Sequence, residues 1–272
     1  MDSGLAGKNA LITAGATGIG FGISEALAAE GVNLAIASKD LDPQNLEKLR
    51  ATGVRVEATQ CDVSQENQVI QMVRGALSAF GHIDLYVNNA AWTWHRPVTE
   101  VDTQSLLNTL QTNLFACVWA CRELSRHMIQ RRSGSILIIG STAMLNPFYQ
   151  ESAYRISKAS LPYYAEVLAI ELAPFGIRVN TVIPGFHLTK LTQAGMSEES
   201  LKKILREIPL GRAGLPADVG AQAVLLLSDK LSGYTTGTSI VIDGGLHLRP
   251  LPFYSAEELL ALNAAGTGTG EG

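Results

Sequence analysis

The chain has 272 residues, of which 46% are apolar and 17% are charged, and its formal net charge is −4. This length suits one well-cored domain, and the acidic balance argues against a nucleic-acid partner. No charged and apolar leader opens the chain and no run of 18 apolar residues occurs, so we expect a soluble, cytoplasmic protein with no membrane partner. Three cysteines favour reduced thiols over a disulfide framework, and the pair Cys117 and Cys121 favours core or interface thiols over a metal site.

Seven short apolar runs alternate with helix-length segments along the chain. Strands are expected at Asn9 to Ala14, Val32 to Ala37, Val54 to Ala58, Ile83 to Val87, Ile136 to Ile139, Val179 to Ile183 and Ser239 to Ile242. Helices are expected over residues 19–30, 43–52, 65–79, 103–131, 151–173 and 217–229, with 103–131 divided in two and Ser64 capping 65–79. Strict alternation predicts parallel strands joined by right-handed crossovers. The fold class is therefore α/β: a single doubly wound domain over residues 1–248, with a seven-stranded parallel sheet and helices on both faces.

Two segments stand apart from this alternation. Between residues 186 and 206, Gly195 precedes Ser197, which suits a helix N-cap, so this substrate loop is either a mobile lid or an ordinary surface helix. Residues 249–272 form a C-terminal extension, in which a capping box at Ser255 predicts a short helix before a flexible Gly/Thr tail. The extension is either disordered or docked on the same or a neighbouring subunit.

A glycine-rich turn follows the first strand and leads directly into a helix. Glycines let the backbone approach a pyrophosphate closely, and the helix N-terminus offers unpaired N–H groups to it. We therefore expect a dinucleotide to bind here. The candidate residues are Gly15, Thr17, Gly18, Ile19 and Gly20.

The preference between NADP and NAD should depend on the end of the second strand, about 20 residues after the glycines, where a side chain meets the adenosine ribose. An acidic residue there would accept from the ribose hydroxyl of NAD, whereas Ser38 and Lys39 suit the 2′-phosphate of NADP. NADP(H) is therefore favoured. Thr17 is not basic and Asp40 follows at once, so NAD(H) use or dual specificity stays open.

Tyr154 and Lys158 stand four residues apart on an expected helix, which places the phenol and the ammonium on one face. At about 4 Å and an effective dielectric near 20, the ammonium would lower the pKa of the phenol from about 10 towards 7. Ser141 follows the apolar strand Ile136 to Ile139, at the sheet edge where open α/β domains bind ligands. A general acid/base beside a hydroxyl donor predicts hydride-transfer chemistry without a metal. The alternative for Ser141 is an ordinary strand-end turn residue.

Together these motifs resemble the short-chain dehydrogenase/reductase family, with its Rossmann-type fold, from about Leu5 to Leu248. The ordered matches are the glycine-rich turn, Cys61-Asp62-Val63, Asn88-Asn89-Ala90-Ala91, Asn113, Ser141, Tyr154 with Lys158, Pro184-Gly185 and Asp243-Gly244-Gly245. Two positions depart from the family pattern, which usually has glycine where this chain has Ala14 and Ala91. We expect φ < 0 at these sites, where a methyl group is tolerated.

The resemblance implies a role for each matched residue. Tyr154 would be the general acid/base, Ser141 would hydrogen-bond the substrate oxygen, and Lys158 would hold the nicotinamide ribose and lower the Tyr154 pKa. Asn113 would support a water-linked proton relay and complete the catalytic set. The other implied cofactor contacts are Asp62 and Val63 at the adenine, Asn89 by the ribose with Ala90 beside it, Pro184 and Gly185 in the later turn, and Thr189 at the carboxamide. The alternative for Asp62 is a residue that neighbours a helix cap at Ser64, and the alternative for Asn89 is a turn residue.

Loops beyond the strand ends should shape the substrate pocket. The tryptophans in these loops either form an aromatic platform for a ring substrate or cover the edge of the core, and the histidines either bind a polar substrate or are ordinary loop residues. The candidate substrate residues are Trp92, Trp94, His95, Ala143, Tyr149, Phe186 and His187.

We therefore expect an enzyme that transfers hydride between nicotinamide and the carbonyl or secondary alcohol of a small molecule, as a carbonyl reductase or alcohol dehydrogenase does. A sugar or polyol dehydrogenase is one alternative, and a non-catalytic cofactor-binding scaffold is another. Residues 209–212 and 237–245 resemble family branches that include acyl-carrier-protein reductases and glucose dehydrogenases. Apolar faces on the helices around 103–131 and 151–173 predict a homo-oligomer, either a tetramer or a dimer.

Overall fold

The computed structural model describes residues 2–147, 150–189, 192 and 196–248. The expectations for Tyr149 and for the extension 249–272 lie outside these residues. Part of the loop 186–206 also lies outside them, but its short helix α8 (Glu198–Arg206) is described, and Ser197 caps it by accepting from Ser200 N at 3.1 Å.

A seven-stranded sheet with every neighbouring pair parallel forms the centre of the molecule, in the order β3-β2-β1-β4-β5-β6-β7. Its strands are β1 (Asn9–Thr13), β2 (Asn33–Ser38), β3 (Val56–Gln60), β4 (Leu85–Asn88), β5 (Gly134–Ile139), β6 (Ile177–Pro184) and β7 (Ser239–Ile242). The fold class and all seven strands are therefore confirmed. The strand order reverses between β1 and β4, which makes a crevice at their carboxyl ends, where open α/β sheets bind ligands.

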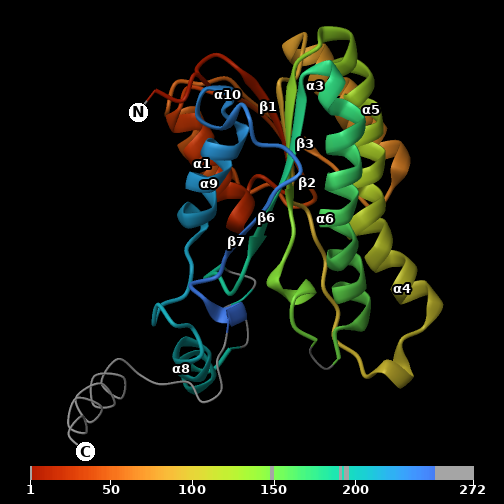
Figure 1. The fold of residues 1–272 in the computed structure, drawn as a ribbon, viewed down its shortest axis with the longest axis vertical. Coiled ribbons are helices and arrows are strands. Elements are labelled where there is room, and N and C mark those ends of the chain that lie inside the picture. The colour runs from red at the N-terminus through yellow and green to blue at the C-terminus, as the bar shows by residue number, and fades with distance from the viewer. Residues whose placement is uncertain (1, 148–149, 190–191, 193–195, 249–272) are drawn as a thin grey trace, which may run out of the picture.

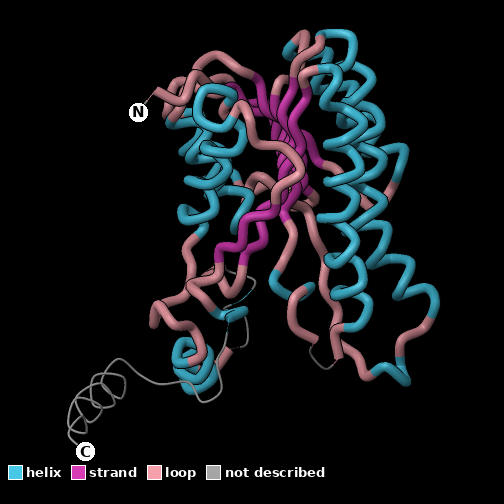
Figure 2. The backbone as a smooth tube through the Cα atoms, viewed as in Figure 1, coloured by secondary structure: helices cyan, strands magenta, loops and turns pink. Residues whose placement is uncertain are grey.

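Helices cover both faces of this sheet, which Figure 1 shows nearly edge-on. One layer contains α1 (Gly18–Ala29), α2 (Pro43–Arg50), α9 (Pro216–Leu227) and α10 (Asp229–Ser232). The other contains α3 (Glu66–Phe80), α4 (Thr103–Leu110), α5 (Ala116–Arg131) and α6 (Ser152–Leu172). In Figure 2 the strands form the middle layer between these helices, as expected for a doubly wound domain.

Each face of the sheet has its own apolar core. On the face covered by α3, α5 and α6, the fully buried side chains include Tyr86, Leu124 and Met128. On the opposite face, Ile12 and Leu27 pack under α1 and α9. Burying one such side chain contributes roughly 1.5–3 kcal/mol. Strands that are buried on both faces carry continuous apolar runs, which is why these strands could be predicted from the sequence.

Two local features differ from the sequence-based expectation or refine it. Residues 103–131 do form two helices, but a π-helical segment, Gln111–Phe115, joins them. The expected cap of the third helix is wrong, because α3 starts after Gln65 with no side-chain cap. Ser64 instead donates from its backbone N and its hydroxyl to Asp62 Oδ1, at 3.0 and 2.7 Å. The local hydrogen bonds between Ser64 and the Asp62 carboxylate therefore replace the expected bond between Ser64 and the start of α3.

Of the helices in the described part of the chain, none is both long enough and apolar enough to cross a membrane. All three cysteines are buried and outside any disulfide, and the sulfur atoms of Cys117 and Cys121 lie 3.9 Å apart within α5.

Candidate active site

The glycine-rich turn between β1 and α1 requires glycine at one position through packing. A Cβ atom on Gly20 would lie 2.1 Å from Ala14 O and 2.5 Å from Asn89 Nδ2, so no larger residue fits. Gly18 adopts φ +55°, a conformation that glycine accepts without strain. The turn thus leaves the backbone accessible at the start of α1, as binding of the phosphates of a dinucleotide requires.

Ala14 corrects one expectation about this turn. Its φ is +52°, in the left-handed region, and not negative as the sequence suggested. Its backbone is held there because its N–H donates to Ala37 O at 2.6 Å and its carbonyl accepts from Asn89 Nδ2 at 3.3 Å. A non-glycine residue in this conformation stores strain, which glycine would release.

A cavity of about 600 Å³ lies beside the ends of β2 and β3 and contains five of the expected cofactor residues. Lys39 Nζ pairs with Asp62 Oδ2 at 3.1 Å, while the buried Ser38 hydroxyl donates to Asp40 O at 2.8 Å. Burial raises the pKa of Asp62, but hydrogen bonds from Ser64 and Lys39 outweigh it and leave that pKa below its usual value. The five expected cofactor residues in the wall of this cavity are Ser38, Lys39, Asp62, Val63 and Ala90.

A second cavity, of about 290 Å³, lies at the ends of β1, β5 and β6. It brings the expected catalytic hydroxyls and ammonium together with the glycine-rich turn, and Ala91 borders both cavities. Gly15 in the turn and Gly20 in the first turn of α1 do not line either cavity. The expected site residues that line this second cavity are Thr17, Gly18, Ile19, Asn89, Ser141, Tyr154, Lys158, Pro184, Gly185, His187 and Thr189.

Asn113 lies at the centre of the π-helical segment and is fully buried. Its Oδ1 accepts from Trp92 N at 2.7 Å, and its Nδ2 donates to Trp92 O and to Ser157 Oγ, both at 2.9 Å. The side chain therefore ties the loop after β4 to helix α6 and does not line either cavity. A role of Asn113 in a proton relay stays a prediction.

The pKa values of Tyr154 and Lys158 are both set mainly by burial. Burial raises the pKa of the Tyr154 phenol, and a hydrogen bond with the Ser141 hydroxyl only partly opposes it. Burial also lowers the pKa of Lys158 to about 8. The Lys158 ammonium donates to Ile139 O at 2.9 Å and lies 6.0 Å from the centre of the Tyr154 ring. The expectation that Lys158 brings the Tyr154 pKa towards 7 is therefore wrong for this structure, because desolvation is the larger effect.

The loop after β4 contains three of the expected substrate residues. Trp92 is 42% exposed and lines the larger cavity, on the adenosine side. The ring of Trp94 lies under the guanidinium of Arg96, 5.4 Å from its centre. His95 Nδ1 lies 3.4 Å from Glu151 Oε1, at the start of α6. These contacts attach the loop to its surroundings, and a substrate contact of the tryptophans stays a prediction.

The remaining substrate candidates lie after β5 and β6. The ring of His187 is only 2% exposed and packs against Gly214, with Nδ1 near Gly185 O at 3.1 Å. Burial lowers the pKa of His187, which favours a neutral ring in the wall of the smaller cavity. Phe186 is half-buried and its carbonyl accepts from Gly214 N. Ala143 contributes backbone contacts: its N–H donates to Ser141 Oγ at 3.2 Å and its carbonyl accepts from Arg155 at 2.8 Å.

The sequence pattern did not point to two charged residues that lie beside Tyr154. Glu151 and Arg155 form an ion pair with Oε2 and Nη2 2.7 Å apart, and both side chains are largely buried. The charge of Glu151 raises the pKa of Tyr154 and that of Arg155 lowers it. Their i, i+4 spacing on the first turn of a helix was the signal that could have found them.

Comparison with known proteins defines the class to which this fold and site belong. A family model described as Enoyl-(Acyl carrier protein) reductase matches residues 13–247. Among solved structures, a short-chain type dehydrogenase/reductase from Mycobacterium marinum superposes with a TM-score of 0.82 at 31% identity, over 89% of this chain and 96% of that one. The Cj0485 dehydrogenase superposes with a TM-score of 0.89 at 27% identity, over 94% and 100% of the two chains. The chain belongs to the short-chain dehydrogenase/reductase family of nicotinamide-dependent oxidoreductases.

Curated relatives within this family are similar over almost their whole length. The 3-oxoacyl-[acyl-carrier-protein] reductase of Chlamydia pneumoniae is 34% identical over 248 residues, which cover 90% of this chain and 99% of the relative. The enzyme of the same name from Staphylococcus aureus (strain Mu50) is 34% identical over 246 residues, covering 89% and 98% of the two chains.

Proposed function

We propose that this protein reduces the carbonyl group of a small molecule to a secondary alcohol, with NADPH as the preferred reductant. The observation that carries the proposal is the smaller cavity, where the hydroxyls of Ser141 and Tyr154 and the ammonium of Lys158 meet beside the glycine-rich turn. A nicotinamide, when bound, supplies hydride to the carbonyl carbon. The protein must then supply the proton and stabilise the charge that develops on oxygen.

The described side chains have the chemistry for both tasks. The raised pKa of Tyr154 keeps the phenol protonated at neutral pH, as a general acid requires. The Ser141 hydroxyl donates to the substrate oxygen and stabilises its developing negative charge. With a pKa of about 8, Lys158 is mostly protonated at pH 7 and favours the phenolate that remains after proton donation. In the oxidising direction the same groups act in reverse, with Tyr154 as the base.

The preference for NADP(H) rests on Lys39 at the rim of the larger cavity. Its side chain is 73% exposed, so the ammonium can meet a 2′-phosphate without losing much hydration. Asp62 already pairs with Lys39, so a 2′-phosphate would compete with that carboxylate, and NAD(H) is the alternative cofactor. The glycine cradle and the remaining wall residues suit the parts that the two dinucleotides share.

The curated relatives make a 3-oxoacyl thioester the first substrate class to test, and a small ketone the second. We further propose a homo-oligomer, because α6 exposes an apolar stripe. Ile156 is 57% exposed, Tyr163 72% and Ile170 78%, and a stripe of this kind suits a second copy of the chain. A monomer in light scattering at micromolar concentration would contradict that part of the proposal.

The experiment follows the absorbance of NADPH and NADH side by side with the purified protein. Acetoacetyl thioesters, ketones, aldehydes, quinones and keto sugars are offered in turn. Faster turnover with NADPH and a 3-oxo compound is expected, and turnover restricted to a sugar with NAD would select the dehydrogenase alternative. Tight NADPH binding without turnover of any substrate would favour a non-catalytic scaffold and contradict the proposal.

A further inference from the structure

Arg155 is the residue after Tyr154 and connects the turn after β5 to the first turn of α6. Its Nη1 donates to Ala143 O at 2.8 Å and to Asn146 O, both on the turn after β5. Its Nη2 pairs with Glu151 Oε2 at 2.7 Å on the first turn of α6. A planar guanidinium can donate in several directions at once, which a lysine ammonium on a flexible stem does less well.

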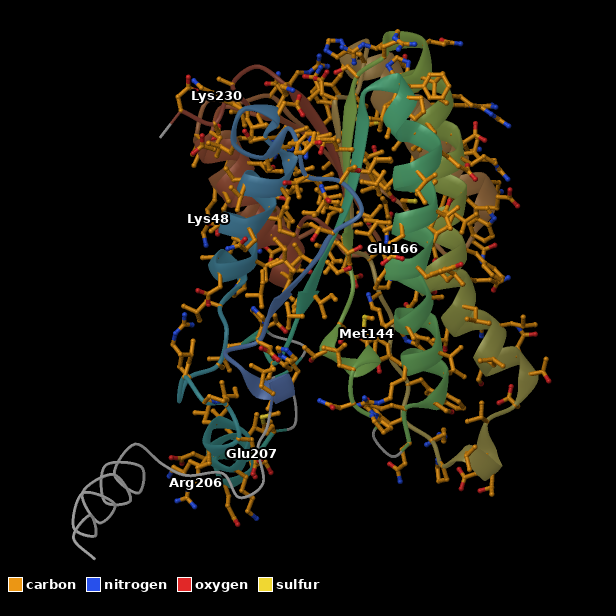
Figure 3. The ribbon with its side chains drawn as sticks, viewed as in Figure 1. Lys48, Met144, Glu166, Arg206, Glu207 and Lys230 are labelled. Carbon is orange, nitrogen blue, oxygen red and sulfur yellow. The ribbon has the colours of Figure 1, made fainter. Side chains whose placement is uncertain are left out.

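The turn that Arg155 holds is the 3-10 segment Thr142–Met144, and Ser141 is its N-terminal cap. Ser141 Oγ accepts from Ala143 N at 3.2 Å, while the carbonyl of the same Ala143 accepts from Arg155. Met144, labelled in Figure 3, marks this turn beside the start of α6. The peptide groups of one residue thus link the guanidinium to the hydroxyl that should bind the substrate oxygen.

Glu151 anchors the guanidinium and extends the network to the loop after β4. Its other oxygen lies 3.4 Å from His95 Nδ1, and Arg96 N donates to Gln150 O at 2.8 Å. The side chains of Glu151 and Arg155 are only 17% and 18% exposed, so solvent screens their attraction less than it screens a surface pair. The turn after β5 and the loop after β4 are therefore both held by the ion pair of Glu151 and Arg155.

We propose that Arg155, anchored by Glu151, is a positioning residue that fixes the Ser141 hydroxyl for the substrate carbonyl. The inference rests on the proposed function, since it assigns a purpose to the placement of Ser141. Arg155 acts through the Ala143 peptide and does not itself line the smaller cavity. Loss of the clamp should loosen the turn and lower kcat, because a displacement near 1 Å at a reacting group can cost up to about 100-fold.

The test compares Arg155→Met and Arg155→Lys with Arg122→Met, a control that removes an ion-paired arginine from the exposed side of α5. Each is measured for kcat, for the KM of NADPH, for thermal unfolding and for amide hydrogen exchange in residues 141–147. We expect Arg155→Met to lower kcat on the order of tenfold, with the KM of NADPH within about twofold of wild type. Exchange in 141–147 should accelerate in this variant and stay at the wild-type rate in Arg122→Met.

A double variant with Ser141→Ala separates positioning from a general loss of stability. If Arg155 acts through Ser141, adding Arg155→Met to Ser141→Ala should change kcat by less than about twofold. Multiplicative losses in the double variant would overturn the proposal. Full recovery of kcat by Arg155→Lys would also overturn it, because charge without the bridging geometry would then be sufficient.

Failure of the proposed function has a different signature. If the wild-type protein oxidises neither NADPH nor NADH with any substrate, the proposed catalytic function of the site is wrong. Exchange in residues 141–147 would still report whether Arg155 clamps the turn. Unchanged exchange in a folded Arg155→Met variant would overturn the inference, whatever the activity.

Discussion

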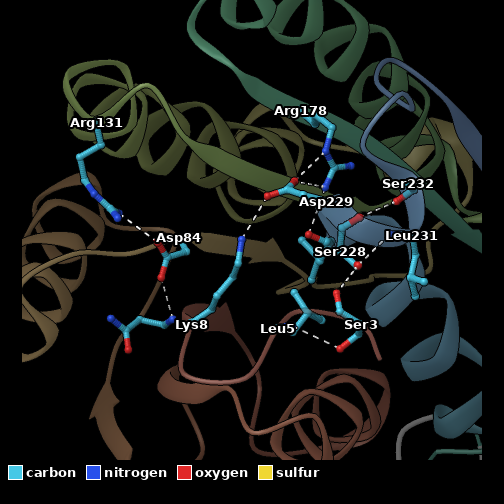
Figure 4. Close-up of polar contacts among 12 residues, drawn as sticks. Ser3, Leu5, Lys8, Asp84, Arg131, Arg178, Ser228, Asp229, Leu231 and Ser232 are labelled. Carbon is cyan, nitrogen blue, oxygen red and sulfur yellow. Dashed lines mark hydrogen bonds and ion pairs between the residues drawn. The ribbon is translucent and has the colours of Figure 1, made fainter. Parts of the chain in front are cut away.

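The amino and carboxyl ends of the parallel strands differ in how their most deeply buried cations are neutralised: Arg178 at the amino end pairs with a carboxylate, whereas Lys158 at the carboxyl end donates to a backbone carbonyl. At the amino end, Figure 4 shows Asp229 between Lys8 and Arg178, with Oδ2 3.1 Å from Lys8 Nζ and Oδ1 2.8 Å from Arg178 Nη2. Arg131 pairs in the same way with Asp84, at 3.1 Å. At the carboxyl end the buried Lys158 donates to a backbone carbonyl, and burial alone lowers its pKa.

This difference separates stability from chemistry within one sheet. Paired charges that also bind backbone carbonyls hold strands and helices together at the amino end. A buried ammonium with a carbonyl partner costs folding free energy, but its charge would assist the proton transfer that we propose at the carboxyl end. Substitutions at the two ends should therefore change different measurements.

The largest expected effect is on activity, at the carboxyl end. Tyr154→Phe removes the proposed acid together with a hydrogen-bond donor to the substrate oxygen, so kcat should fall at least about 100-fold. Steady-state kinetics with the best substrate measures this loss. The melting temperature should stay close to that of wild type, since the ring still fills its place.

Tyr163→Phe provides the matched control on the same helix. Tyr163 is 72% exposed, so loss of its hydroxyl should leave kcat and stability unchanged. Turnover above a tenth of wild type in Tyr154→Phe would exclude Tyr154 as the general acid.

The second prediction concerns the free energy that burial of Lys158 costs. Its pKa is about 8 in the folded protein and 10.5 for an ordinary solvent-exposed lysine, as in the unfolded chain, so between these pH values the unfolded state binds more protons. Stability from this group therefore rises with pH across that window, and below pH 8 its burial carries a constant cost. The difference of about 2.5 pKa units corresponds to roughly 3 kcal/mol.

Urea unfolding of wild type and Lys158→Met at pH 7, 8, 9 and 10 measures this cost. The wild type should gain stability relative to the variant by up to about 1.4 kcal/mol per pH unit above pH 8. Tyrosines and cysteines titrate in both proteins and cancel in the difference. A difference that stays constant from pH 7 to 10 would show that Lys158 keeps an ordinary pKa.

The third prediction concerns the substitution of Arg178, which forms an ion pair at the amino end of the strands. Arg178 is 7% exposed and donates from Nη1 to Leu226 O at 2.7 Å and from Nη2 to Leu227 O at 3.1 Å, besides its pair with Asp229. Arg178→Met leaves these carbonyls at the end of α9 without a donor, and should lower the free energy of unfolding by about 2 kcal/mol. The KM values for substrate and cofactor should not change.

Arg55→Met is the control for this variant. Arg55 also joins a carboxylate, Glu57, to a backbone carbonyl, that of Ala79, but its side chain is 52% exposed. An exposed pair contributes less than about 1 kcal/mol. Equal destabilisation by the two substitutions would contradict the idea that the buried network at the amino end carries stability.

The sequence predicted the elements whose pattern is local. Buried parallel strands are continuous apolar runs, and the four-residue spacing of Tyr154 and Lys158 placed both side chains in one cavity. The helix 217–229 was less well predicted, since Ser228 is extended and divides it into α9 and α10. The raised pKa of Tyr154 could not be predicted from the residue spacing either, because desolvation depends on the packing of distant segments.

Contacts between distant loops were not visible in the sequence either. Arg155 reaches carbonyls 12 and 9 residues upstream, and only the folded turn after β5 brings them within its range. The amide of Asn113 connects Trp92 and Ser157, and neither contact follows from the local pattern around Asn113. The burial of His187 follows from close packing on Gly214, a residue 27 positions away.

The smallest expected effect concerns the backbone at the carboxyl end of β1. Ala14 has φ +52°, so Ala14→Gly should stabilise the protein by about 1 kcal/mol, because glycine adopts this conformation without the clash of a Cβ atom. Ala51→Gly is the control of opposite sign: Ala51 has φ −63°, so glycine there should destabilise by about 0.5–1 kcal/mol. Urea unfolding of both variants measures the two signs. Destabilisation by Ala14→Gly would mean that the methyl group on the cavity wall contributes more than its strained backbone costs.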